Sequence, residues 1–185
     1  MELDLLGEHA DRAYPILASL VTPRPIAWIS TIDETGRVNL APFSFFNVFG
    51  AEPPLVIVAP GNRPNGEPKD TARNIRVRGE FVVNLVSPDL AEAMVKTAAS
   101  LPPGEDEAAH EQIEMIPSSV VAAPRVARAP ASLECKVHSI QEIGENRLVL
   151  GIVHRVHVQD SMVEPDTLRI IQKAYTPVGR MASPN

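Results

Sequence analysis

Proline constrains the fold of this chain more than any other residue type, because 18 of the 185 residues are prolines. Proline cannot donate a hydrogen bond to a sheet ladder and it stops helices, so frequent prolines produce many short elements with firm ends. This pattern favours a barrel with structured loops over a helical bundle. About seven segments read as strands, in antiparallel-looking pairs, with two or three helices inserted between them. The sequence therefore predicts a mainly β protein, a small closed or split barrel with helical insertions.

The overall composition is that of one globular domain spanning residues 1–185, with a core from about 18 to 180. Hydrophobic residues make up 44% of the chain and charged residues 22%, as in ordinary soluble proteins. The net charge of −6 argues against a nucleic-acid-binding protein, which normally carries a basic field. No apolar run approaches the ~20 residues of a membrane span, and the acidic opening has no signal-peptide pattern. We therefore expect a cytoplasmic protein that binds neither nucleic acid nor membrane.

Several familiar catalytic and metal-binding patterns are absent from the sequence. The single cysteine, Cys135, excludes an internal disulfide and a Cys–Cys metal cluster, and we expect it to be an inert buried thiol. His154 and His157 are three residues apart on a predicted strand, so they point to opposite faces and cannot share one metal. Neither a Gly-x-Ser-x-Gly element nor a G-x-G-x-x-G fingerprint occurs. We therefore expect no metal site and no catalytic side chain.

The stretch Arg24–Asn47 is the most informative part of the chain. An alternating strand is predicted over residues 26–32, and it runs into the turn Asp-Glu-Thr-Gly at 33–36, where glycine tolerates a positive φ. A second strand is expected from Arg37, with a break at Ala41-Pro42. This hairpin is the element around which we expect the functional site to be built.

A cluster of aromatic residues follows the hairpin. Four of the five phenylalanines lie between Phe43 and Phe49, in a chain that is only 4% aromatic. Core packing is the usual explanation for such a cluster, and a core or dimer contact is likewise the default for Trp28. Ser44 and Asn47, however, place polar groups among the rings, and a flavin has both an apolar edge and a hydrogen-bonding edge. We interpret the hairpin and its continuation as a flavin-binding element.

A second candidate is formed by Lys69, Asp70 and Thr71. A lysine, a hydroxyl and the free amides of a helix N-terminus are the groups that bind a phosphate monoester, and a helix is predicted to begin here with Asp70 or Thr71 as its N-cap. An ordinary capped helix start explains these residues equally well. Ser30 and Thr31 would add hydroxyls to the same site, although a Ser-Thr pair in a strand is more often there for its β-propensity.

The remaining patterns predict further strands and helices but say less about the chemistry of the protein. They are a strand at Ile16–Val21, helices at Thr71–Val77 and Pro88–Ser100, and two long strands at Ala131–Ile143 and Arg147–Gln159.

Five segments in register resemble the flavin reductase-like family of FMN-binding split barrels, the group that includes flavoredoxin. They read RPIAWISTID, NLAPFSFFN, PKDTARNI, GEFVVNLVS and LECKV, and the resemblance covers Pro23–Gly179. It implies a six-stranded split barrel that forms a homodimer and holds FMN non-covalently near the subunit interface.

The resemblance also implies the positions of the cofactor-binding residues. Those along the flavin and its ribityl chain would be Trp28, Ser30 and Thr31. Those framing the isoalloxazine, partly through backbone amides, would be Ala41, Pro42, Ser44, Phe45, Phe46 and Asn47. Those at the phosphate or ring edge would be Lys69, Asp70 and Thr71, with Asn74 close behind and Arg63 as a weaker candidate.

The activity implied by the resemblance is electron transfer from NADH, NADPH or a redox protein partner to flavin or to a downstream acceptor. Two alternatives are a non-catalytic FMN-binding or flavin-sensing protein, and a related barrel that oxidises a phosphorylated vitamin or reduces a specific organic substrate. The chain departs from the family after Arg180, where the segment is Met-Ala-Ser-Pro-Asn instead of a glycine-rich, aromatic-bearing one. The sequence does not place the acidic segment 105–114 relative to the site.

Overall fold

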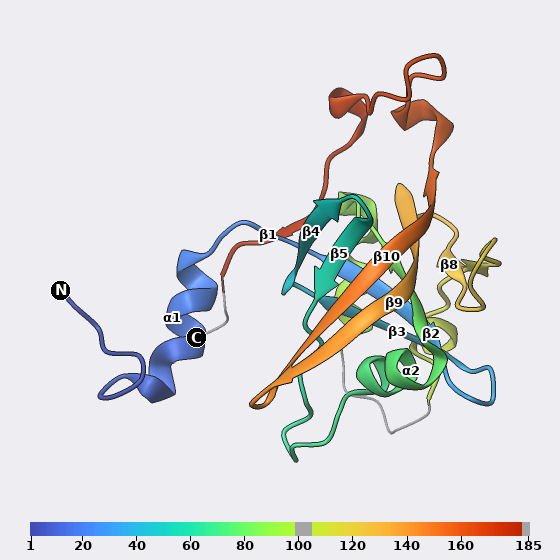
Figure 1. Cartoon of the computed structure of the whole chain (residues 1–185). Helices are drawn as coiled ribbons and strands as arrows, with labels where there is room; N and C mark the ends of the chain where they lie inside the picture. Colours follow the sequence, from blue (N-terminus) through green and yellow to red (C-terminus); the bar gives the residue numbers. More distant parts are fainter. Residues whose placement is uncertain (99–104, 183–185) are drawn as a thin grey trace.

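The computed structural model describes residues 1–98 and 105–182 and is built around a seven-stranded antiparallel sheet (Figure 1). In spatial order the strands are β3 (Val38–Phe43), β2 (Ala27–Ile32), β6 (Glu80–Asn84), β9 (Ala131–Ile143), β10 (Asn146–Val158), β5 (Pro54–Val58) and β4 (Phe46–Ala51). Two short pairs accompany the sheet, β1 (Arg24–Pro25) with β11 (Gly179–Arg180) and β7 (Met115–Ile116) with β8 (Arg125–Val126). The predicted mainly β fold with antiparallel strands is confirmed.

The helices are short and most of them lie between strands, as the sequence predicted, but η1 and α1 precede β1 and the helices outnumber the two or three expected. They are η1 (Ala10–Arg12), α1 (Ala13–Leu20), α2 (Asp70–Arg78), η2 (Pro88–Leu90), α3 (Ala91–Lys96), α4 (Glu107–His110), η3 (Asp160–Met162) and η4 (Gln172–Ala174). In Figure 1, α1 stands clear of the sheet, and the chain after β10 makes a long excursion before it returns through β11. No helix of the described residues has the length and apolar content needed to cross a membrane.

Strand β2 is buried along its whole length because both of its faces are covered. Ala27 and Ile29 belong to one core cluster, which also contains Phe81 of β6. Trp28 lies in a second cluster, with Leu90 of η2 among its other members. Side chains alternate across a strand, so one strand supplies both layers. The buried position of β2 makes it the fixed reference for the elements packed on either side.

Three expectations about where strands and helices lie are wrong. Residues 16–21 were predicted as a strand, but residues 16–20 belong to α1 and Val21 is its C-cap. Pro15 is tolerated in this helix because it stands in the first turn, whose N–H groups have no partner within the helix. The predicted break at Ala41-Pro42 is absent, and β3 runs through to Phe43. Proline is acceptable there because β3 is the first strand of the sheet order and its outer side pairs with no strand of the described chain.

The third wrong expectation concerns the helix predicted over Pro88–Ser100, which is shorter than expected. The structure forms the 3₁₀ turn η2 followed by α3, which ends at Lys96. Residues 99 and 100 lie outside the described residues. The two long C-terminal strands, in contrast, are confirmed to within one residue at each end.

A buried carboxylate, Glu134 of β9, anchors the loop between β7 and β8. Its side chain is 0% exposed, and its two oxygens accept hydrogen bonds from the backbone amides of Ser119 at 2.7 Å and Val120 at 2.6 Å. The imidazole of His157 pairs with the same carboxylate. Burial would raise the pKa of Glu134, but the two amides and His157 outweigh burial and lower it.

We expect the substitution Glu134→Leu to lower the free energy of unfolding at pH 7 by about 2–4 kcal/mol, because the amides of Ser119 and Val120 and the imidazole of His157 lose their buried partner. A carboxyl with a lowered native pKa stabilises the fold above its unfolded pKa and loses that contribution as the pH falls. The difference between the variant and the wild type should therefore shrink between pH 5 and pH 3 in denaturant titrations. Lys136→Leu, at an exposed position of the same strand, is the control; equal effects of the two substitutions would contradict this role.

Candidate functional site

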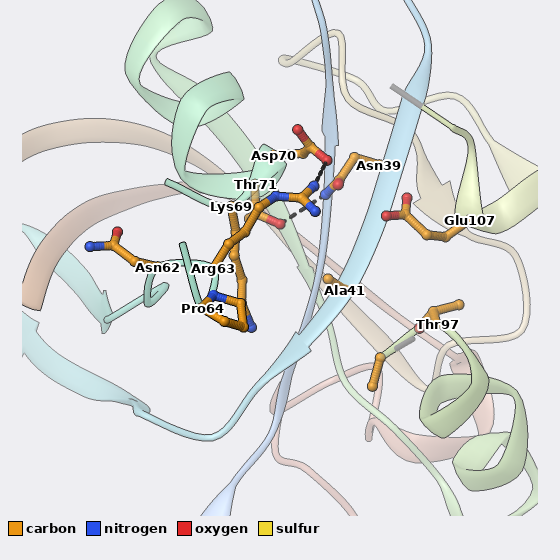
Figure 2. A pocket seen from close by; sticks show the side chains of 11 residues that line it. Asn39, Ala41, Asn62, Arg63, Pro64, Lys69, Asp70, Thr71, Thr97 and Glu107 are labelled. Carbon is orange, nitrogen blue, oxygen red and sulfur yellow. Dashed lines mark hydrogen bonds and ion pairs between the residues drawn. The ribbon is translucent and has the colours of Figure 1, made fainter. Parts of the chain in front are cut away.

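A cavity of about 390 Å³ lies at the outer edge of β3, where α2 begins and where α3 ends (Figure 2). Polar and charged side chains converge on it from the loop before α2, from α2 itself, from β3 and from α4. Its lining includes Asn39, Ala41, Arg63, Lys69, Asp70 and Thr71. Four of these, Ala41, Lys69, Asp70 and Thr71, are residues that the sequence predicted for the site, and Arg63 was the weaker candidate.

The N-terminus of α2 opens toward this cavity. Lys69 is the N-cap, with an extended backbone, and its side chain makes no capping hydrogen bond. The expectation that Asp70 or Thr71 caps the helix is therefore wrong, because both are already helical. The amides of the first turn are left for another acceptor, and the helix dipole makes this position favourable for an anion. The Lys69 ammonium lies 5.7 Å from the centroid of the Phe43 ring.

Asp70 organises the positive charge next to the helix start. Its carboxylate pairs with Arg63 at 2.5 Å (Nη2 to Oδ2) and also with Arg73. The bond to Arg63 crosses from the preceding loop to the helix and holds that guanidinium at the cavity wall, as Figure 2 shows. The carboxylate of Asp70 is thus directed at cations, and within the described residues Lys69 has no carboxylate partner.

Buried amide–hydroxyl hydrogen bonds fix α2 against the sheet. The Asn39 side chain donates to Thr71 Oγ1 at 2.8 Å, and the Asn74 side chain donates to Thr31 Oγ1 at 3.1 Å. All four residues are buried. Thr31 and Asn74 thus lie directly beneath the cavity wall and do not line it. Sequence reasoning missed Asn39, although the alternation of β3 places it on the same face as Ala41.

Trp28 and Ser30 occupy the opposite face of β2 from Thr31, because neighbouring side chains alternate. The Ser30 hydroxyl donates to the Pro124 carbonyl and accepts a hydrogen bond from Asn84 at 3.2 Å. The Trp28 indole donates to Thr97 Oγ1 at 2.9 Å, and Thr97 lines the cavity. Trp28 therefore supports a residue of the cavity wall, whereas the structure does not bring Ser30 into the cavity.

The other predicted residues of the aromatic segment, Pro42, Ser44, Phe45, Phe46 and Asn47, lead from the cavity along β3 into β4 and do not line it. Ser44 Oγ accepts a hydrogen bond from the Arg24 guanidinium at 3.4 Å. Phe45 is partly exposed and meets the Tyr14 ring edge-on, with centroids 6.1 Å apart. Asn47 is exposed on β4. These residues form a partly apolar surface that continues from Ala41.

One residue of the acidic segment, Glu107, reaches the cavity. Glu107, at the start of α4, is 8% exposed and lines the cavity on the side opposite Arg63 and Lys69 (Figure 2). Its Oε2 accepts the Leu40 backbone N–H at 3.1 Å, which satisfies a donor on the outer edge of β3. Burial raises the pKa of Glu107, and the negative charges of Asp70 and Asp106 raise it further.

A second cavity of about 470 Å³ lies between η2, the end of β10 and the excursion that follows β10. Asp89 and Arg128 form an ion pair at 2.5 Å on its wall. None of the residues predicted for the site lines it. The cavity beside α2 is therefore the candidate site, because convergent charged groups meet a helix N-terminus there.

The single thiol lies in the core and does not line this cavity. Among the residues that the structure describes, no three His, Cys, Asp or Glu side chains are grouped so that they could hold a metal ion. Cys135 is buried in the core cluster of the sheet. Burial raises the pKa of the Cys135 thiol, and the neighbouring Glu134 carboxylate adds to the effect.

Sequence comparison identifies the family. The flavin reductase like domain matches residues 19–179, so the chain belongs to the flavin reductase-like family. A protein of Deinococcus radiodurans is 43% identical over 183 residues, which cover 96% of this chain and 81% of that protein.

Comparison with solved structures extends the match to the fold. Nitrilotriacetate monooxygenase component B from Bacillus cereus superposes with a TM-score of 0.92 at 31% identity, covering 100% of this chain and 93% of the other. The 2-nitrobenzoate 2-nitroreductase of Pseudomonas fluorescens superposes with a TM-score of 0.90 at 30% identity, covering 100% and 90%. The fold class predicted from the sequence, a mainly β split barrel, is confirmed.

We expect Cys135 to resist thiol reagents in the folded protein, because the thiol is buried and its pKa is raised. Titration with a chromogenic disulfide at pH 8 should label no thiol in native protein and one thiol per chain in guanidinium chloride. Rapid labelling of the native protein would show that the core around Cys135 opens on the timescale of the reaction.

Proposed function

We propose that this protein is an FMN-binding oxidoreductase of the flavin reductase type, which moves electrons from NADH, NADPH or a protein donor to flavin or to a downstream acceptor. The observation that carries the proposal is the cavity at the start of α2, where Lys69, Arg63 and Thr71 surround free helix amides. Membership of the flavin reductase-like family supports the redox chemistry. That the flavin is FMN and that NADH or NADPH donates the electrons are parts of this proposal.

The donor set beside α2 fits a phosphate monoester. Two cationic side chains, a hydroxyl and the first-turn amides supply hydrogen bonds and positive charge to an anion of this size. The Thr71 hydroxyl accepts from Asn39, so its own hydrogen remains available to a phosphate oxygen. Asp70 would hold Arg63 in place and leave Lys69 to meet the phosphate.

The isoalloxazine would lie along the segment that runs from Ala41 to Asn47. This segment offers both the apolar contacts and the hydrogen-bonding groups that the ring needs, since Pro42, Phe45 and Phe46 are apolar and Ser44 carries a hydroxyl. Bound FMN would supply the hydride chemistry. The protein would contribute orientation, and we assign no nucleophile and no general base. Trp28 would act from beneath the wall through Thr97, and Thr31 and Asn74 by holding α2.

The names of the solved neighbours favour a final electron acceptor other than flavin. One is named as a component of a monooxygenase and the other as a nitroreductase. We therefore extend the proposed function to the transfer of electrons from the flavin to a partner protein or to a small organic acceptor. Turnover of NADH or NADPH with free FMN as acceptor would separate an enzyme from a non-catalytic FMN-binding or flavin-sensing protein.

We also propose that two copies assemble into a homodimer through α1 and β4. Both elements expose large apolar side chains, with Leu20 74%, Val48 71% and Phe49 62% exposed. Helix α1 buries only Ala18 and stands clear of the sheet in Figure 1. Strand β4 is the last in the sheet order. An apolar surface of this kind is typical of an interface between subunits, and Phe45 at its border would bring the partner close to the flavin-binding segment.

The first test is the visible spectrum of the purified protein, followed by FMN titration of the apoprotein. Lys69→Ala and Thr71→Ala should each weaken FMN binding by about 1–3 kcal/mol, because each removes a charge-assisted contact to the phosphate. Lys136→Ala, on an exposed face of β9, is the control, and Thr71→Ser keeps the hydroxyl. A protein that binds no FMN would refute the proposal, and unchanged affinity in both variants would refute the phosphate assignment.

Light scattering after gel filtration tests the homodimer. The wild type should elute with twice the 20.1 kDa mass of the chain, and the double variant Leu20→Glu, Val48→Glu should elute as a monomer, because two carboxylates would be buried in an apolar interface. Leu168→Glu, at an exposed position of the excursion after β10, tests whether that segment takes part. A monomeric wild type at micromolar concentration would contradict the assembly.

A further inference from the structure

The cavity beside α2 has walls of opposite charge. Arg63 and Lys69 face it from the loop and the helix start, and Glu107 faces it from α4. Figure 2 shows the Glu107 carboxyl on the far side of β3, directed back toward Asn39 and the cavity. A carboxylate in this place is unexpected in a site for an anion, because its negative charge would share one cavity with the phosphate and repel it.

The hydrogen bonds of Glu107 leave one oxygen for a ligand. Oε2 accepts the Leu40 amide at 3.1 Å, and the N-capping role at α4 is taken by Asp106, whose side chain accepts the Ala109 amide. No other residue of the described chain donates a hydrogen bond to Oε1; the carboxylate's one further contact is with the backbone N–H of Glu107 itself, and Glu107 lines the cavity. When protonated on Oε1, the side chain could therefore keep its bond to Leu40 and offer an O–H donor to the cavity.

The charged groups around Glu107 determine whether a bound anion favours the protonated or the ionised form of its carboxyl group. On its own helix, Asp106 adds negative charge, while His110 is exposed and lies 3.7 Å from Glu111. From α2, Asp70 adds negative charge and is itself paired with arginines. Across the cavity, Arg63 and Lys69 carry positive charge that acts in the opposite sense, and Arg63 is already paired with Asp70. Asn39 of β3 and Thr97, just after α3, are neutral. An added phosphate dianion would make the ionised form of Glu107 still less favourable.

We propose that Glu107 takes up a proton when a phosphate group enters the cavity, and that the protonated carboxyl then donates a hydrogen bond to a phosphate oxygen. The proton comes from solvent, and no bond of the ligand is broken. Binding of a phosphorylated ligand is thereby linked to pH through one protein side chain. The inference rests on the proposed phosphate site beside α2, and it gives the acidic segment a role in ligand binding.

The linkage has a defined direction. Where the complex holds more protons than its separated components, affinity falls as the pH rises, by up to about tenfold per pH unit for one fully coupled proton. The wild type should therefore lose FMN affinity between pH 6.5 and pH 8.5. Glu107→Gln cannot ionise, but its carbonyl can still accept the Leu40 amide while its NH₂ donates to the phosphate. This variant should bind FMN with little dependence on pH, and about tenfold more tightly than the wild type at pH 8.5.

The test is titration calorimetry of FMN binding at pH 8 in buffers of different ionisation enthalpy, which counts the protons taken up. At this pH the free FMN phosphate is already a dianion. Wild-type protein should take up a substantial fraction of a proton per FMN, and Glu107→Gln close to none. Glu114→Gln, at an exposed position of the same acidic segment, should behave as the wild type. Riboflavin, which lacks the phosphate, should bind without Glu107-dependent proton uptake.

The outcomes separate this inference from the proposed function. If the wild type binds no FMN, the proposed function fails and the inference fails with it. If FMN binds but Glu107→Gln takes up as many protons as the wild type, only the inference is overturned. If Glu107→Gln weakens FMN and riboflavin equally, Glu107 contacts the ribityl chain or the ring, and the inference is also overturned. Thermal melts of all variants confirm that each is folded.

Discussion

The geometry of the candidate site depends on two hydrogen bonds between buried side chains, from Asn39 to Thr71 and from Asn74 to Thr31. They connect α2 to the β2–β3 pair, and each would leave an unsatisfied polar group in the interior if it were broken. Because β2 is covered on both faces, the helix is attached to a strand that is buried along its whole length. The orientation of the first-turn amides of α2 is therefore set by the core and not by the surrounding loop.

The charges of the site are arranged around this fixed helix start. Asp70, one residue into α2, draws Arg63 from the preceding loop and Arg73 from the next turn of the helix. Lys69 lies outside this pairing and rests over the Phe43 ring. The cations thus differ in freedom, because two are held by a carboxylate and one is held only by an aromatic face. Glu107 closes the opposite wall and keeps the cavity from being uniformly positive.

Much of the fold could be predicted from local pattern. The alternation of β2, the turn ending at Gly36 and the two long strands β9 and β10 follow from period two and from glycine, and they form nearly where expected. The failures have tertiary causes. Residues 16–21 read as a strand, but no strand in the described part of the chain pairs with them. Proline at 42 suggested a break because the edge position of β3 is not visible in the sequence.

The site was predicted less completely than the fold. The segment Lys69–Thr71 could be found because its residue types suit a phosphate, and the structure brings it to a cavity together with Ala41. Asn39 was missed because a single asparagine in a strand carries no signal until its cross-strand neighbours are known. Ser30 and Thr31 looked equivalent in the sequence, yet they face opposite sides of the sheet. The contribution of Glu107 depends on a contact across 67 residues, which no local pattern can reveal.

The outer edge of β3 has a consequence for the way this protein meets other chains. Leu40 and Pro42 are two residues apart, so their backbone nitrogens face the same edge. The Leu40 N–H is occupied by Glu107, and Pro42 has no N–H to offer. A peptide strand approaching this edge would find no donor at two successive positions, which blocks β-augmentation and edge-to-edge aggregation. The cavity mouth can thus remain open to solutes without becoming a template for another polypeptide.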